Sequence, residues 1–306
     1  MIVVVCPGQG SQTPGFLEPW IQDSGSKALL ESLSEAASVD LVKHGTVSDA
    51  DTIRDTQIAQ PLIVAAGILT LDALAETDHL SKTGGIAGHS VGEFTAAAGA
   101  GVLDAHDAVR LVGLRGRAMA EAAAAVATGM SAVIGGDDAE IANRLSELGL
   151  YAANYNGGGQ LVVAGELSAL AALSETPPAG ARVIPLQVAG AFHTPFMESA
   201  VASLSDAAQT VNHSDPRQKL WTNRDGSLVS GGQSFIDLMV GQVSSPVRWD
   251  LCMESFAVAG VTGIIEVSPA GALVGLAKRA LKGIPTVAIK TPEDLTVARE
   301  LIDSLA

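Results

Sequence analysis

Short unbroken runs of apolar residues alternate with longer amphipathic stretches along most of the chain. Unbroken apolar runs are typical of strands buried on both faces of a parallel sheet, and apolar residues three and four positions apart are typical of helices. The runs predict buried strands at 2–6, 85–87, 219–222, 263–267 and 285–289. The amphipathic stretches predict helices at 27–38, 57–77, 93–98, 104–121, 195–208, 234–243, 248–258, 271–281 and from 294 onward. This alternation predicts an α/β fold.

The pattern changes at about residue 126. Strand-like runs at 130–134, 150–155, 160–164 and 182–186 alternate with helix-like stretches at 137–147 and 166–174. The order strand, helix, strand, strand, helix, strand is that of a ferredoxin-like unit. We therefore predict a ferredoxin-like subdomain at 126–190, inserted into a larger domain made of 1–125 and 191–306. Asn154, Asn156 and the glycines 157–159 are interpreted as its hairpin turn.

The pentapeptide Gly88-His89-Ser90-Val91-Gly92 lies where a predicted strand turns into a predicted helix. The glycines suit a sharp turn because they have no Cβ, and a serine between them presents its hydroxyl away from the sheet. The amide of Val91, at the start of the helix, can donate to an oxyanion. A chance occurrence is the alternative, because the chain has 33 glycines. The strand before and the helix after favour a nucleophilic serine.

A nucleophilic serine needs a base that takes its proton. His193 is the candidate, because it lies between Phe192 and Pro195, a proline that opens a predicted helix, at the end of the inserted segment. A buried histidine with a purely structural role is the alternative. His89 adjoins Ser90 and is expected to point to the opposite face. The remaining histidines lie in polar stretches and are expected at the surface: His44, His79, His106 and His213.

The sequence shows no acid that would complete a catalytic triad, so a main-chain carbonyl could orient the imidazole. A metal site is not expected, because the sequence has no His-x-x-x-His, no Glu-x-x-His and no paired cysteine spacing.

Arg115 lies on an apolar stripe of the predicted helix 104–121. Ala108, Val112, Arg115 and Met119 follow one another at intervals of four, three and four residues, whereas Arg117 lies about 200° away around the helix. A buried guanidinium needs an anionic partner. Periodicity alone leaves open whether that partner is a carboxylate of the protein or a ligand.

Charge and cysteine usage limit the class of protein. There are 18 basic and 33 acidic residues, a net charge of −15, which argues against nucleic-acid and anionic-membrane partners. Cys6 and Cys252 imply no disulfide framework, so a reducing, cytoplasmic location is expected. The first residues lack the features of a signal peptide, and no apolar run is expected to reach the length of a membrane span.

Five short motifs occur in an order that is typical of one enzyme family. They are Gly8-Gln9-Gly10-Ser11-Gln12, Gly88-His89-Ser90-Val91-Gly92-Glu93, Leu114-Arg115-Gly116, Gly190-Ala191-Phe192-His193 and Pro246-Val247-Arg248-Trp249. Together they resemble bacterial malonyl-CoA:acyl carrier protein transacylases, the stand-alone acyltransferases of fatty-acid and type II polyketide synthesis. The resemblance runs from about residue 3 to 290. It implies an α/β-hydrolase-like parallel-sheet domain with an inserted ferredoxin-like subdomain.

The resemblance implies a malonyl-serine intermediate and assigns a role to each matching residue. Ser90 would be the acylated nucleophile and His193 its base, then acid. The main-chain carbonyl of Gln242 would orient the imidazole. The backbone amides of Gln9 and Val91 would form the oxyanion hole.

The resemblance also implies how substrates are chosen. Arg115 would hold the malonyl carboxylate with both guanidinium branches, which would make a ligand its anionic partner. Phe192 would crowd an α-methyl group and so disfavour methylmalonyl.

Malonyl-CoA and acyl carrier protein are the substrates that the resemblance implies, with phosphopantetheine arriving on the carrier and no cofactor bound to the chain. We expect a monomer. An acidic carrier would need a local basic patch, and the candidates are Arg182, Arg217, Arg224, Arg248, Lys278, Arg279 and Lys282. The alternatives are a serine thioesterase or lipase with the same nucleophile and base, and a non-catalytic binding subunit of the same fold.

Overall fold

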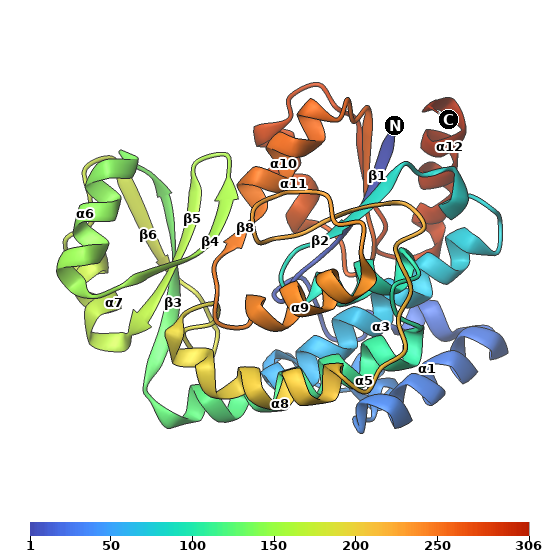
Figure 1. Cartoon of the computed structure of the whole chain (residues 1–306), viewed down its shortest axis with the longest axis horizontal. Helices are drawn as coiled ribbons and strands as arrows, with labels where there is room; N and C mark the ends of the chain where they lie inside the picture. Colours follow the sequence, from blue (N-terminus) through green and yellow to red (C-terminus); the bar gives the residue numbers. More distant parts are fainter. Residues whose placement is uncertain (306) are drawn as a thin grey trace.

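The computed structural model describes residues 1–305 and contains two sheets (Figure 1). The larger sheet has five strands, all parallel, in the order β10-β9-β1-β2-β7. Its strands are β1 (Ile2–Cys6), β2 (Gly85–Gly88), β7 (Lys219–Trp221), β9 (Gly263–Glu266) and β10 (Thr286–Ala288). β1, β2 and β9 are buried along their whole length, which is why their sequences are apolar apart from Glu266, the last residue of β9.

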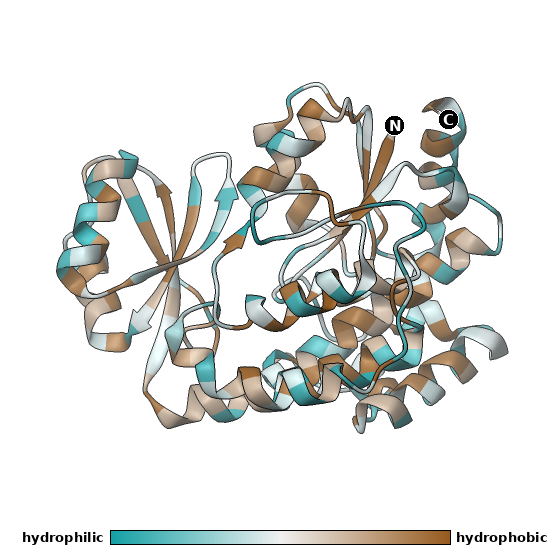
Figure 2. Ribbon diagram, viewed as in Figure 1, coloured by the Kyte–Doolittle hydropathy of each residue, from teal (hydrophilic) through white to brown (hydrophobic). Residues whose placement is uncertain are grey.

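Helices cover both faces of this sheet, with α1, α3, α5 and α8 on one side and α10 and α11 on the other (Figure 1), and hydrophobic residues are concentrated in the strands and on the helices between them (Figure 2). The side chains of β1 alternate between the two faces. Ile2, Val4 and Cys6 pack in the larger core with α1, α3, α5 and α8, whereas Val3 and Val5 pack with α10 and α11. These helices and their neighbours are α1 (Ser24–Ala37), α2 (Leu41–Thr46), α3 (Thr56–Ala75), α4 (Gly92–Gly99), α5 (Ala105–Ala125), α8 (Glu198–Ala208), α9 (Gly232–Gln242), α10 (Trp249–Val258), α11 (Ala272–Ala280) and α12 (Leu295–Leu305). The short helix α2 was not predicted.

The expectation that no apolar stretch reaches the length of a membrane span was wrong. Within residues 1–305, α3 is one helix that is long and apolar enough to cross a membrane. Most of its residues are buried in the protein, however, where it packs against α4 and α5. Its length and composition are those of a central core helix, which is apolar around its whole circumference because neighbours surround it.

The smaller sheet has the order β6-β3-β5-β4-β8. Its first four strands are antiparallel, as a ferredoxin-like unit requires, and α6 (Asp138–Leu148) and α7 (Leu167–Glu175) pack on it. Its strands are β3 (Thr128–Gly135), β4 (Tyr151–Gly157), β5 (Gln160–Glu166), β6 (Ala181–Pro185) and β8 (Val247–Arg248). The predicted fold class, a parallel sheet with a second, smaller sheet, is confirmed; the division at residues 126 and 190 stays a prediction.

The strand β8 was not predicted, because two residues are too few for a periodicity. It comes from a part of the chain far beyond residue 190 and pairs in parallel with β4, with Asn154 opposite Val247 and Tyr155 opposite Arg248. The smaller sheet is therefore completed by a segment that follows α9.

Candidate active site

Ser90 lies in a sharp turn between β2 and α4. Its φ is +53°, a left-handed conformation that a residue with a Cβ rarely adopts. The flanking glycines are required by close packing: a Cβ on Gly88 would lie 2.1 Å from the backbone of Gly92, and one on Gly92 would lie 2.1 Å from the carbonyl oxygen of Cys6. The backbone amide of Ser90 donates to Asn223 Oδ1 at 2.7 Å, which holds the strained turn in place.

Replacing Gly92 by alanine should destabilise the protein by at least about 2 kcal/mol, because the added methyl group overlaps backbone atoms that cannot move aside. Gly241→Ala is the matched control: nothing lies within 4 Å of a Cβ at this helical position. It should be neutral or stabilising by up to about 1 kcal/mol. Urea unfolding of both variants measures the difference, and equal stabilities would contradict the packing argument.

His193 lies within hydrogen-bond distance of the serine hydroxyl. Its Nε2 is 2.7 Å from Ser90 Oγ, and its Nδ1 is 2.8 Å from the main-chain carbonyl of Gln242. A carbonyl oxygen can only accept, so Nδ1 carries the ring proton and Nε2 is free to accept the proton of the serine. His193 is also left-handed, with φ +63°, just before the turn of 3₁₀ helix that Pro195 opens.

The surroundings of His193 keep its ring neutral. Burial, and after it the positive charge of Arg115, lower the pKa of the imidazole to about 3. A neutral ring at ordinary pH is the form that can act as a base.

Arg115 is buried, with 1% of its surface exposed, and reaches the same hydroxyl. Its Nη2 lies 3.5 Å from Ser90 Oγ and donates to Gln242 Oε1 at 3.0 Å, while Nη1 donates to Gln60 Oε1 at 2.7 Å. Nε has no partner within residues 1–305. The direct partners of this cation are therefore neutral amide oxygens. Periodicity left open whether a carboxylate of the protein or a ligand pairs with Arg115, and among the described residues the structure shows no carboxylate in direct contact with it.

The hydrogen-bond network under the serine was missed by sequence reasoning. Asn223 follows β7 and donates through Nδ2 to the carbonyl of Gly88 at 2.7 Å, while its backbone amide donates to Glu93 Oε1 at 2.7 Å. Gln242 Nε2 donates to Glu93 Oε2 and also lies 3.2 Å from the carbonyl oxygen of Ser90. The resemblance marks Gln242 for its main-chain carbonyl only. No pattern in the sequence marks the side chain of Gln242 or any part of Asn223, because these groups meet only in the fold.

Gln9 and Val91 lie beside Ser90 in one cleft, at the carboxyl ends of β1 and β2. Within the described chain, neither backbone amide has an acceptor among the hydrogen bonds of turns, caps and side chains. Two free N–H groups next to the hydroxyl can receive an oxyanion. In the sheet, β2 lies on one side of β1 and β9 lies on the other. Ligand sites of parallel sheets lie where the strand order changes direction in this way.

The cleft between the two sheets has a volume of about 570 Å³ and is lined by strands of the smaller sheet and by the segments that follow β1 and β2 in the larger one. Phe192 lines it from the loop after β6, and Arg279 from the end of α11. The interpretation of Asn154 and Asn156 as turn residues was wrong: both lie in β4, are buried and face the cleft. The side chain of Asn156 is fixed there by a partner, since its Oδ1 is 2.9 Å from His89 Nε2.

Comparison with known proteins places this geometry in a family. The family description "Acyl transferase domain" matches residues 3–298. The malonyl CoA-acyl carrier protein transacylase of Mycobacterium tuberculosis H37Rv is 49% identical over 296 residues, which cover 96% of this chain and 98% of that protein. The chain belongs to this transacylase family. The corresponding protein of Escherichia coli K12 is 33% identical and is covered over 98% of its length.

Solved structures of transacylase family members superpose on nearly all of the chain. The crystal structure of MCAT from Mycobacterium tuberculosis has a TM-score of 0.95 at 48% identity, covering 98% of this chain and 99% of that one. A malonyl-transacylase solved in complex with its type II PKS acyl carrier protein has a TM-score of 0.92 at 29% identity, with the same coverage of 98% and 99%.

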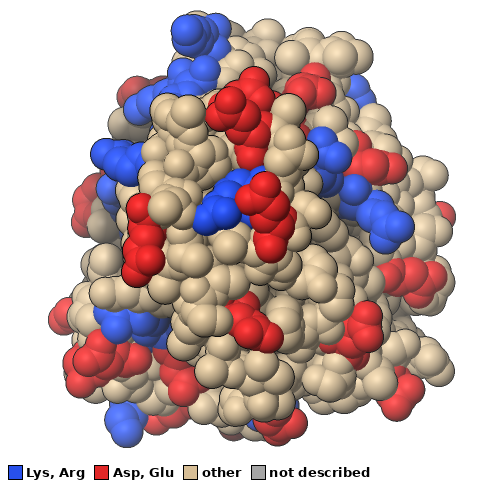
Figure 3. Space-filling model, turned by 90° about the vertical axis from the view of Figure 1, so that its left-hand side faces the viewer, with Lys and Arg blue, Asp and Glu red and all other residues tan. Residues whose placement is uncertain are grey.

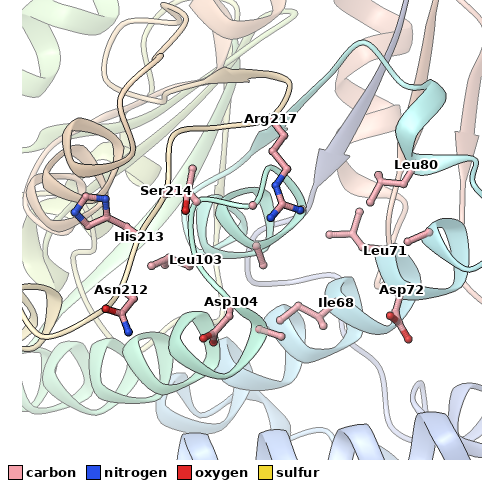
Figure 4. A pocket seen from close by; sticks show the side chains of 16 residues that line it. Ile68, Leu71, Asp72, Leu80, Leu103, Asp104, Asn212, His213, Ser214 and Arg217 are labelled. Atoms are coloured by element: carbon pink, nitrogen blue, oxygen red, sulfur yellow. The ribbon is translucent and has the colours of Figure 1, made fainter.

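The basic residues proposed for docking the carrier are spread over the molecule. Arg279 borders the cleft, whereas Arg248 is paired with Asp250 at 2.8 Å. Arg217 lies in a separate groove of about 500 Å³ between α3 and the segment before β7, together with Asp72 and Asp104 (Figure 4). On the face formed by the smaller sheet, positive and negative side chains are interspersed (Figure 3). The docking patch therefore stays a prediction.

Proposed function

We propose that the chain transfers malonyl groups from coenzyme A to the pantetheine thiol of acyl carrier protein through a malonyl-serine intermediate. One observation carries this proposal: the Ser90 hydroxyl lies 2.7 Å from a neutral imidazole and 3.5 Å from a buried guanidinium. The imidazole supplies a base for the attack, and the guanidinium supplies a receptor for an acyl group that ends in a carboxylate.

In the first half-reaction, Ser90 Oγ attacks the thioester carbonyl of malonyl-CoA and gives its proton to His193 Nε2. The carbonyl oxygen becomes an oxyanion and accepts hydrogen bonds from the amides of Gln9 and Val91. The C–S bond then breaks, and the imidazolium returns the proton to the leaving sulfur. The products are coenzyme A and malonyl-Ser90.

In the second half-reaction, the pantetheine thiol of the carrier attacks the ester carbonyl and His193 takes the thiol proton. The same two amides receive the oxyanion, and the proton passes to Ser90 Oγ as the ester bond breaks. Gln242 keeps the imidazole in the required tautomer throughout, because its carbonyl oxygen holds the proton on Nδ1. This cycle uses no cofactor of the chain, and we propose that it runs on a cytoplasmic monomer.

Arg115 gives the site its preference for malonyl. Its unpartnered Nε and its branch near Ser90 are available to a carboxylate on the acyl group. An acetyl group would leave the buried cation without an anion, and sites that bury a polar group reject substrates that leave it unpaired. The nearly buried ring of Phe192 lines the same cleft, where it would crowd an α-methyl substituent.

Competition between acyl-CoAs tests this proposal. Equal amounts of malonyl-, methylmalonyl- and acetyl-CoA are mixed with the protein, and the acyl group on Ser90 is identified by intact mass and peptide mapping. We expect a malonyl adduct to dominate by at least about tenfold, the preference that 1.4 kcal/mol of binding difference gives. Ser90→Ala should carry no adduct. Near-equal labelling by the three substrates would rule out the roles of Arg115 and Phe192, and no adduct at all would favour a binding subunit.

A further inference from the structure

Glu93 is a buried carboxyl that the proposed reaction does not use. It lies in the first turn of α4, three residues after the nucleophile, and 1% of its surface is exposed. Its Oε1 accepts from the backbone amide of Asn223 at 2.7 Å, and its Oε2 accepts from Gln242 Nε2. Burying a carboxyl without a paired cation is costly when the carboxyl is ionised.

A single side-chain amide separates this carboxyl from the malonyl receptor. Gln242 Oε1 accepts from Arg115 Nη2 at 3.0 Å, and Gln242 Nε2 donates to Glu93 on its other side. The other titratable group that faces Glu93 is the thiol of Cys252, and burial raises the pKa of this thiol far above its usual range, so it stays neutral. A negative charge on Glu93 therefore acts mainly on Arg115. In turn, the positive charge of Arg115 lowers the pKa of Glu93.

We propose that Glu93 must hold a proton when Arg115 binds the malonyl carboxylate, so that malonyl recognition is coupled to proton uptake by Glu93. This inference rests on the proposed function and deepens it. Two ionised carboxylates that share one buried cation repel each other, and protonation of one of them removes this repulsion. The substrate carboxylate touches the guanidinium directly, so the proton is held by the more remote group, Glu93.

The environment of Glu93 suits this role. Burial raises its pKa to about 8, although the Asn223 amide, the Thr222 side chain and the charge of Arg115 act in the opposite direction. Arg115 keeps its charge at that pH, because burial lowers its pKa only to about 10. The hydroxyl of Thr222 can accept the acid proton. Above pH 8, an ionised Glu93 would neutralise part of the positive charge of Arg115, which the malonyl carboxylate needs for binding.

The sign of the pH dependence follows from linkage. A group that is protonated in the complex and partly ionised in the empty site binds protons when the ligand binds, and ligand affinity then falls as pH rises through the empty-site pKa. His193 does not contribute between pH 6.5 and 8, because its pKa is about 3. Malonyl affinity should therefore weaken above neutral pH, and acetyl affinity should not.

Calorimetric proton counting tests the coupling. Ser90→Ala prevents acylation, so malonyl-CoA binds without reacting, and titration in two buffers of different ionisation enthalpy gives the protons taken up. At pH 8 we expect about half a proton more for malonyl-CoA than for acetyl-CoA, since half of Glu93 is ionised in the empty site. At pH 6.5 the difference should be close to zero. Acetyl-CoA cancels any titration of the coenzyme phosphates.

Two double variants assign the proton. Ser90→Ala with Glu93→Gln should show no difference between the two ligands at pH 8. Ser90→Ala with Glu266→Gln should keep the difference, because Glu266 is the other buried glutamate and caps α11 through the amides of Gly271, Leu273 and Val274. If a double variant does not fold, the count on Ser90→Ala alone still decides whether malonyl binding takes up a proton.

The failure of this inference differs from the failure of the proposed function. Tighter binding of malonyl-CoA than of acetyl-CoA with equal proton counts overturns the coupling and leaves the proposed function standing. A proton difference that survives Glu93→Gln overturns the assignment to Glu93. Equal, weak binding of both ligands at pH 6.5 would overturn both proposals.

Discussion

Replacing His193 by asparagine should lower kcat/KM for malonyl transfer by about a hundred- to ten-thousandfold, the contribution that a general base commonly makes. Asparagine suits this position because it tolerates the left-handed backbone at φ +63°. Its amide can also donate to the carbonyl of Gln242, yet it cannot take a proton from Ser90. Single-turnover acylation by malonyl-CoA, followed by rapid quench and mass analysis, measures the loss.

His106→Asn is the matched control for this substitution. His106 lies at the start of α5, where its ring is 3.1 Å from the hydroxyl of Ser32 and far along the helix from the cleft. The control should acylate at the rate of the unchanged protein. If His193→Asn acylates within a few-fold of that rate, the imidazole is not the base.

Replacing Arg115 by methionine should lower kcat/KM for malonyl-CoA by about a hundred- to a thousandfold. Breaking one buried charge pair costs about 3–5 kcal/mol, and each 1.4 kcal/mol is a factor of ten. Acetyl-CoA loses nothing comparable, since it offers no carboxylate, so the preference between the two substrates should shrink by a similar factor. Steady-state rates with both acyl-CoAs measure this change.

The ratio of the two rates separates recognition from stability. Methionine leaves the buried Oε1 atoms of Gln60 and Gln242 without a donor, which costs about 1–3 kcal/mol each. The melting temperature should therefore fall, and the rates with both acyl-CoAs are measured at a temperature where the variant is folded, so that the loss of stability cancels in their ratio. Arg117→Met is the control: it removes a hydrogen bond to the carbonyl of Ala37 on another face of α5 and should leave substrate preference unchanged. An unchanged preference for malonyl-CoA over acetyl-CoA in Arg115→Met would contradict the role of Arg115 in malonyl recognition.

Much of the fold is predictable because its core elements obey strong periodicities. β1 and β2 are apolar throughout and β9 is apolar up to Glu266, its last residue. Asp104, at the start of the predicted helix 104–121, caps α5 by accepting from the amide of Asp107. The pairing of Ser90 with His193 was predictable for a similar reason. Each is marked locally, one by flanking glycines and the other by a following helix start.

The rest of the site depends on contacts that no local pattern encodes. Asn223 and Gln242 each lie at the end of an ordinary element. The roles of their side chains appear only when β7 and α9 bring them under the serine turn. Asn154 and Asn156 were misread because asparagine beside glycine is typical of turns. A tertiary hydrogen bond to His89, which follows β2, holds Asn156 in the strand instead. Asn154 is held in the strand by its pairing with Val162 of β5.

The short strand β8 limits how the cleft can open. The smaller sheet is joined to the rest of the protein by the segments on either side of residues 126–190, and by β8, which pairs with β4 five residues after Gln242. A subdomain attached at one edge can rotate as a rigid body, but one attached at three separate points cannot rotate far without breaking the pairing of β8 with β4. A large opening of the cleft would displace β8 and with it the nearby backbone of Gln242, which orients the imidazole. We therefore expect the cleft to admit the pantetheine arm by movement of loops rather than of the whole smaller sheet.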